Sequence, residues 1–180
     1  MKSFLQFISI LSVLLIPVLS NAQQPKNADF ENWQTIQHFE DPEYFYSTNF
    51  LHSFTCIRLL VTKSSDSYQE SYALHLESDS MNGNVFTGRI FQSNPLLGGF
   101  LFGMGGGRPY TAQPDSLVGY VKHDIPSNDT ALITLIFTKN GNPINGVFKK
   151  FTGTQANYKR FSTPISWGML PIPDTLSIMI

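Results

Sequence analysis

The chain has 180 residues, a formal net charge of −1 and only 14% charged side chains. A charge this small and this diluted provides no basic surface for nucleic acid, so nucleic acid is excluded as the expected partner. The single cysteine, Cys56, excludes an internal disulfide, and its flanks in SFTCIRLLV predict a buried thiol.

Residues 1–22 have the features of a secretory signal peptide. A lysine precedes an apolar run over residues 4–19, and the small side chains of Ser20 and Ala22 suit cleavage after Ala22. The alternative, a membrane anchor, fits less well because the run is short and contains a proline. We therefore expect a secreted or cell-surface protein whose mature part, residues 23–180, has no transmembrane segment.

The mature part lacks helical periodicity and carries short strand patterns between turn residues. The 13 glycines, 11 prolines and 13% aromatic residues fit such an arrangement. In chain order, we expect strands at about residues 30–35, 57–63, 72–78, 85–91, 116–123, 130–139, 145–153, 158–163 and 174–180. Because no helices separate them, these strands predict an all-β fold: a single-domain antiparallel β-sandwich or jelly roll.

The clearest strand pattern is TALITLIFTK, residues 130–139. Both of its faces are largely apolar, which predicts a central strand covered on both sides. It ends at Asn140-Gly141, a pair that tolerates positive φ in a two-residue turn, so we predict a hairpin over residues 130–152. By contrast, residues 116–123 alternate, with Val118, Tyr120 and Lys122 on a solvated face.

Residues 98–115, GGFLFGMGGGRPYTAQPD, raise the question of a phosphate-binding loop. A P-loop requires lysine followed by serine or threonine after its glycines, and Arg108-Pro109 stands there instead. A dinucleotide-binding loop requires a following helix, which the pattern does not predict. We expect a connecting loop with unusual backbone conformation.

Catalytic motifs are absent from the sequence. There is no G-x-S-x-G, and the four histidines lack metal-type spacing. Paired carboxylates for glycoside hydrolysis leave no spacing signature, so a pair could be drawn from Glu31, Glu40, Glu43, Glu70 and Glu77. Since no motif supports such a pair, we expect a protein that is not an enzyme.

Three segments, NADFENWQ, FEDPEYFYSTNF and RPYTAQPD, combine aromatic with planar polar side chains. Sugar rings stack on aromatic faces while polar groups bond their hydroxyls, so these segments predict glycan contacts. We expect Tyr44, Tyr46 and Tyr110 to be exposed and, with Arg108, to form the ligand-binding residues. The aromatic residues expected in the core are Trp33, Phe45 and Trp167.

Two stretches, VFTGRIF and GRPYTAQPDSLVGYVKHDIPSNDTALITLIFTK, resemble the PCMD (carbohydrate metabolism domain) family of secreted and surface bacterial proteins. The matching positions are Thr87-Gly88, Gly107 to Tyr110, Pro114, Leu117, Gly119 to Lys122, and Asp129. FENWQ and DPEYFYSTN are similar to openings of such proteins. The chain departs from the family pattern at Gln113 and His123, and it lacks the family's final strand and sorting tail.

The resemblance implies a jelly-roll sandwich of carbohydrate-binding type, with further domains of a longer surface protein and type IX secretion. The expected function is a non-catalytic carbohydrate-binding module whose partner is a glycan or polysaccharide; the alternative is a structural or adhesive spacer without a small-molecule ligand. Because PDTLSIMI carries its strand pattern to Ile180, either the last strand ends at the carboxylate or the chain is truncated.

Sandwiches of this kind often hold one structural calcium ion, which requires six to eight oxygen ligands. Asp29 or Glu31, with carbonyl groups from residues 64–71, would suit it. Calcium is thus the one cofactor that the sequence suggests.

Overall fold

The computed structural model describes residues 23–92 and 107–180, and within them the chain is all-β with antiparallel sheets. The predicted fold class, an antiparallel β-sandwich, is confirmed, whereas the jelly-roll strand order stays a prediction. The predicted signal peptide and residues 98–106 of the glycine-rich loop lie outside the described residues.

The main sheet has six strands in the order β12-β11-β14-β8-β3, with β9 paired to β14 off this path. These strands are β3 (Tyr46–Ser47), β8 (Ile90–Phe91), β9 (Arg108–Pro109), β11 (Ala131–Lys139), β12 (Asn142–Phe151) and β14 (Thr175–Met179). The central place of β11, between β12 and β14, agrees with its apolar pattern on both faces.

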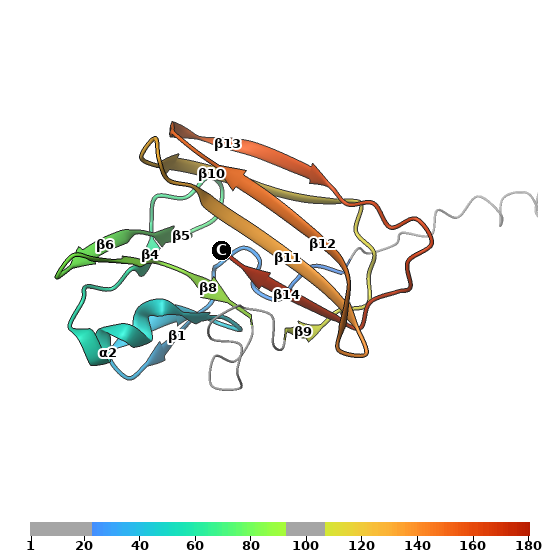
Figure 1. Cartoon of the computed structure of the whole chain (residues 1–180), viewed down its shortest axis with the longest axis horizontal. Helices are drawn as coiled ribbons and strands as arrows, with labels where there is room; N and C mark the ends of the chain where they lie inside the picture. Colours follow the sequence, from blue (N-terminus) through green and yellow to red (C-terminus); the bar gives the residue numbers. More distant parts are fainter. Residues whose placement is uncertain (1–22, 93–106) are drawn as a thin grey trace, which may run out of the picture.

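Four two-stranded sheets complete the described part of the fold. They pair β1 (Trp33–Ile36) with β2 (Phe39–Pro42), β4 (Val61–Ser64) with β5 (Ala73–Leu76), β6 (Ser78–Met81) with β7 (Asn84–Thr87), and β10 (Ser116–Asp124) with β13 (Thr154–Pro164). A short 3-10 helix, η1 (Thr48–Leu51), leads into α2 (His52–Thr55). Figure 1 shows the β10–β13 pair as a layer above β11, β12 and β14.

The predicted hairpin over residues 130–152 is confirmed as β11 and β12. Asn140 has φ 51° and Gly141 has φ 77°, so both central residues of the turn adopt the left-handed backbone that suits a two-residue hairpin. The carboxylate of Asp174 accepts a hydrogen bond of 2.7 Å from the Asn140 backbone N–H. This bond ties the turn to the start of β14.

The core lies between the main sheet and the layer formed by β4, β5 and β10. Its buried members include Phe137 on β11, Leu176 on β14 and Val61 on β4, and Leu117 on β10 packs against them. Burial of apolar side chains from both layers is what holds a sandwich together.

The expected core aromatics lie inside to different degrees. Phe45 is 1% exposed, whereas Trp167 is half-buried and packs edge-on against Phe137 at 4.8 Å between centroids. Trp33 is half-buried as well, and its indole N–H donates to the Phe30 carbonyl at 2.6 Å.

The prediction of a buried Cys56 is wrong, because its side chain is exposed. Cys56 ends α2 in the left-handed conformation, with φ 58°. The strand predicted over residues 57–63 begins only at Val61. Cys56 therefore lies in a turn and not beside a buried strand.

Candidate functional site

The predicted contact residues Arg108 and Tyr44 come together beside the main sheet. The guanidinium carbon of Arg108 lies 5.4 Å from the Tyr44 ring centroid, and Nη2 donates to the Tyr44 carbonyl at 3.4 Å. Tyr44 is 38% exposed, as predicted. The sequence also allows an ion pair between Arg108 and Asp115. In the structure, Arg108 contacts Tyr44 instead, and the Asp115 carboxylate accepts from the Ser116 hydroxyl at 2.7 Å.

The backbone conformation and close neighbours of position 107, just before Arg108, require a glycine there. Its φ is 114°, and a Cβ there would lie 2.7 Å from the carbonyl oxygen of Leu176 and 2.8 Å from Cγ2 of Thr175. A larger residue would therefore push β9 away from β14. The last glycine of the loop thus has a structural role, as expected.

The expectation that Tyr110 is exposed is wrong: it is 4% exposed. Its ring packs 5.9 Å from that of Phe137, and its hydroxyl donates to the Gln23 carbonyl at 2.9 Å. Burial raises the pKa of Tyr110. Its polar neighbours in sequence did not reveal that the chain after β9 turns this ring into the core. Tyr46 is half-buried and pairs with Phe91 across β3 and β8.

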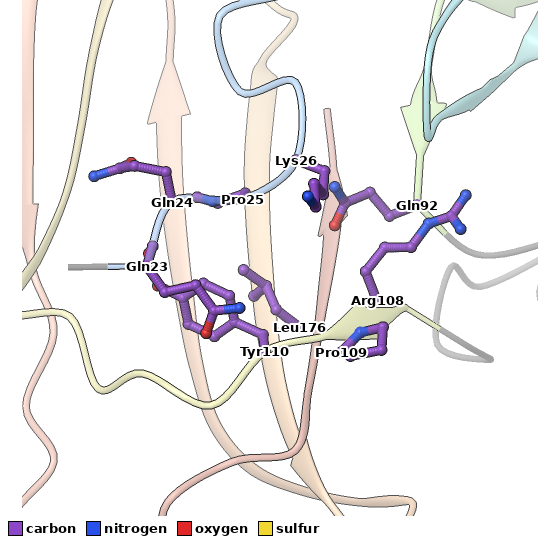
Figure 2. Close-up of a pocket in the computed structure, with 9 residues that line it drawn as sticks. All are labelled: Gln23, Gln24, Pro25, Lys26, Gln92, Arg108, Pro109, Tyr110 and Leu176. Atoms are coloured by element: carbon purple, nitrogen blue, oxygen red, sulfur yellow. Dashed lines mark hydrogen bonds between the residues drawn. The ribbon is translucent and has the colours of Figure 1, made fainter. Parts of the chain in front are cut away.

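Arg108 and Tyr110 also line a small cavity, which we call the Arg108 pocket (Figure 2). Its walls are the N-terminal residues 23–26, Gln92, Arg108, Pro109, Tyr110 and Leu176. The cavity measures about 30 Å³, which is room for one or two water molecules and too little for a sugar ring.

A second surface, formed by three tyrosines, was not predicted as a site. Tyr68, in the loop between β4 and β5, stacks on Tyr120 of β10 with 3.8 Å between centroids and 13° between planes. Tyr158 of β13 lies 6.2 Å from Tyr68, tilted by 56°. Tyr68 is 47% and Tyr120 is 40% exposed. We call these three residues the tyrosine surface.

Charged groups edge the tyrosine surface. Lys122 forms an ion pair with Asp66, and its Nζ lies 5.2 Å from the Tyr158 ring centroid. The Tyr158 hydroxyl donates to the Asp66 carbonyl at 2.5 Å, which fixes the loop onto β13. Exposed Arg160 lies opposite Tyr120 in the strand register. Aromatic faces next to both donors and acceptors are therefore available to a ligand on this layer.

The sequence could have supplied part of this surface. Alternation along β10 correctly places Tyr120 and Lys122 on the solvated face, and Tyr158 lies in a predicted strand. The sequence gives no signal that the loop carrying Tyr68 folds over β10, because Tyr68 and Tyr120 are 52 positions apart in the chain.

Of the two predicted calcium ligands, Glu31 contacts the end of the loop after β4, next to residues 64–71. The Glu31 carboxylate accepts from the Tyr72 backbone N–H at 2.7 Å, and Asp29 Oδ1 accepts from the Glu31 N–H at 3.4 Å. No group of three or more His, Cys, Asp or Glu side chains suited to a metal occurs in residues 23–92 and 107–180. A calcium ion at Asp29 and Glu31 stays a prediction.

Two of the carboxylates considered for hydrolysis have partners of a structural kind. Glu77 pairs with Arg58 at 2.6 Å, and Glu40 pairs with Lys63 at 3.1 Å. Lys63 in turn lies 5.0 Å from the Tyr72 ring centroid. The Glu40–Lys63 pair joins β2 to β4, and the Glu77–Arg58 pair joins the residue between β5 and β6 to the segment before β4.

Polar residues of FEDPEYFYSTNF, considered for sugar hydroxyls, form a buried network instead. The carboxylate of Asp41 accepts from the backbone N–H and hydroxyl of Ser47, whose hydroxyl oxygen accepts from the Asn49 N–H at 3.0 Å. The Asn49 side chain bonds the backbone of Leu60 and Val61. Burial raises the pKa of Asp41, although its bonds from Ser47 act in the opposite direction.

Comparison of the chain with protein-family models, curated proteins and solved structures found no significant match. The described part of the chain contains no helix of the length and apolar character that crossing a membrane requires. The resemblance to the PCMD family therefore rests on the sequence motifs alone.

Proposed function

We propose that this chain is a non-catalytic carbohydrate-binding module of an exported, surface-associated protein, and that a glycan lies across the tyrosine surface. The observation that carries the proposal is the stacked pair of exposed rings, Tyr68 and Tyr120, on the outer layer of the sandwich. Neighbouring aromatic rings that remain partly exposed form a surface that a ligand can cover.

The geometry suits the flat C–H face of a sugar ring. Tyr120 covers one face of Tyr68, so much of the 47% exposure of Tyr68 belongs to the other face and the ring edges. Lys122 and Arg160 can donate to hydroxyl groups beside the rings, and the Asp66 carboxylate can accept from them. An open surface of this kind suits a chain of sugars better than a single enclosed one.

Affinity electrophoresis of residues 23–180 through gels containing plant, host or bacterial polysaccharides tests the proposal. Retardation by at least one polysaccharide is expected. Tyr68→Ala and Tyr120→Ala should abolish the retardation, because each removes a stacking face, whereas Tyr120→Phe should largely keep it.

Tyr72→Ala is the matched control, since Tyr72 is a tyrosine of similar exposure, 37%, that contacts Lys63 outside the tyrosine surface. Loss of binding in Tyr44→Ala but not in Tyr68→Ala would move the site to Arg108. Absence of retardation by every polysaccharide would favour the spacer function.

A further inference from the structure

Within residues 23–92 and 107–180, two buried donor groups that line the Arg108 pocket have no acceptor. Gln92 is 3% exposed, and its Nε2 is buried without a hydrogen-bond partner in the described part of the chain. The Nε of Arg108 is buried and unpartnered in the same sense. Buried polar groups in folded proteins are almost always paired, so two such donors beside one cavity indicate a missing acceptor.

The charge around the cavity favours an anion as that acceptor. Arg108 and Lys26 are both cations, and no aspartate or glutamate is among the residues that line the pocket. Figure 2 shows the Gln92 amide and the Lys26 side chain pointing toward one another, with Arg108 rising beside Gln92. An anion gains more here than an uncharged acceptor, because hydrogen bonds between oppositely charged groups are stronger than neutral ones.

We propose that the Arg108 pocket binds a carboxylate group. A carboxylate carries two acceptor oxygens on one planar group, so it can accept from both unpartnered donors at once. One oxygen would accept from Gln92 Nε2 and the other from Arg108 Nε, while Lys26 neutralises the charge. Arginine N–H groups and carboxylates form strong, planar, charge-assisted hydrogen bonds.

The rest of the ligand would lie outside the cavity, near Tyr44. The Tyr44 ring is 38% exposed and lies against the Arg108 guanidinium, so a ring attached to the carboxylate has an aromatic face beside it. An acidic sugar has this combination, and a small free carboxylate has only the acid group. This site shares no residue with the tyrosine surface, so it stands independently of the proposed function.

Nuclear magnetic resonance of ¹⁵N-labelled residues 23–180 tests the site with acetate as the probe. Acetate should shift the side-chain signals of Gln92 Nε2 and Arg108 Nε, and acetamide, its uncharged counterpart, should not. Glucuronate binding more tightly than acetate would identify the acidic sugar as the source, and equal binding would identify a free carboxylate; glucose should shift neither signal.

Gln92→Leu should weaken acetate binding about tenfold or more, because it removes a hydrogen bond to a charged group. Lys26→Gln should weaken it several-fold, and because Lys26 is exposed, this variant tests the site without disturbing the core. Lys150→Gln, at an exposed position of β12 outside both proposed sites, is the control and should bind normally. Equal shifts with acetate and chloride, or no shift of either signal, would overturn the proposal.

Discussion

Replacement of Asn49 by alanine should destabilise the fold strongly, because its side-chain amide holds the buried start of β4. Asn49 is 1% exposed, and its side chain bonds three backbone groups of the strand start at β4. Oδ1 accepts from the N–H groups of Leu60 at 2.9 Å and Val61 at 3.0 Å, and Nδ2 donates to the Val61 carbonyl at 2.7 Å. Leu60 and Val61 are each 1% exposed, so solvent cannot replace these bonds directly.

The magnitude follows from counting the groups left without partners. Each buried backbone group that loses its partner costs about 1–3 kcal/mol. A water molecule that enters the space vacated by the amide would restore part of this. We therefore expect Asn49→Ala to lower the free energy of unfolding by about 3–5 kcal/mol, a large share of the about 5–15 kcal/mol typical of a domain.

Urea unfolding followed by tryptophan fluorescence measures this loss. Asn157→Ala, at an exposed position of β13, is the control and should stay within about 0.5 kcal/mol of the parent chain. Hydrogen exchange should show faster exchange of the Leu60 and Val61 amides in Asn49→Ala. A loss below about 1 kcal/mol, with unchanged exchange at both amides, would refute the claim that Asn49 holds β4 in place.

Three further predictions concern pH and packing. Burial raises the pKa of Asp41 in the folded state, so the free energy of unfolding should fall as the pH rises from the ordinary aspartate range to that raised value. Asp41→Asn should remove this part of the pH profile of stability, measured by urea unfolding. The hydrogen bond from the Asn140 N–H lowers the pKa of Asp174, so stability should fall as acid protonates it, and Asp174→Asn should flatten the profile there. Gly88→Ala should lower the free energy of unfolding by about 1–3 kcal/mol or more, measured by thermal unfolding, since its Cβ would lie 2.4 Å from the Leu60 carbonyl oxygen. Gly146→Ala should be tolerated, because the nearest contact of its Cβ would be at 3.4 Å. Equal effects of the two variants would contradict the packing argument.

Much of the fold was predictable because its signals are local. The alternation in residues 116–123 and the apolar run in 130–139 correspond to β10 and β11, and Asn140-Gly141 forms the expected turn. The strands missed were short or irregular. β6 was not predicted, although it meets β7 at Asn82-Gly83, whose φ angles of 52° and 76° form a turn of the same kind.

The candidate site was predictable only in part, because residue type does not determine which way a side chain faces. Tyr44 and Arg108 are in contact, but Tyr110 has turned into the core, and the polar residues Asp41 and Asn49 support backbone groups. Glu31 reaches the loop that was proposed for it but bonds a backbone N–H. Several of these outcomes depend on contacts between residues far apart in the chain, such as Tyr44 and Arg108, which are 64 positions apart.

The two proposed binding regions belong to different sheets, and this separates their contributions. The tyrosine surface is formed by β10, β13 and the loop after β4, whereas the Arg108 pocket is formed by residues at β8, β9 and β14 together with the N-terminal segment. Substitutions at distant sites that share no partner usually have additive effects. If both regions contact an acidic polysaccharide, Tyr68→Ala combined with Gln92→Leu should therefore weaken its binding by the product of the two separate effects. If only one region contacts the polysaccharide, the double variant should weaken binding only as much as the single variant in that region.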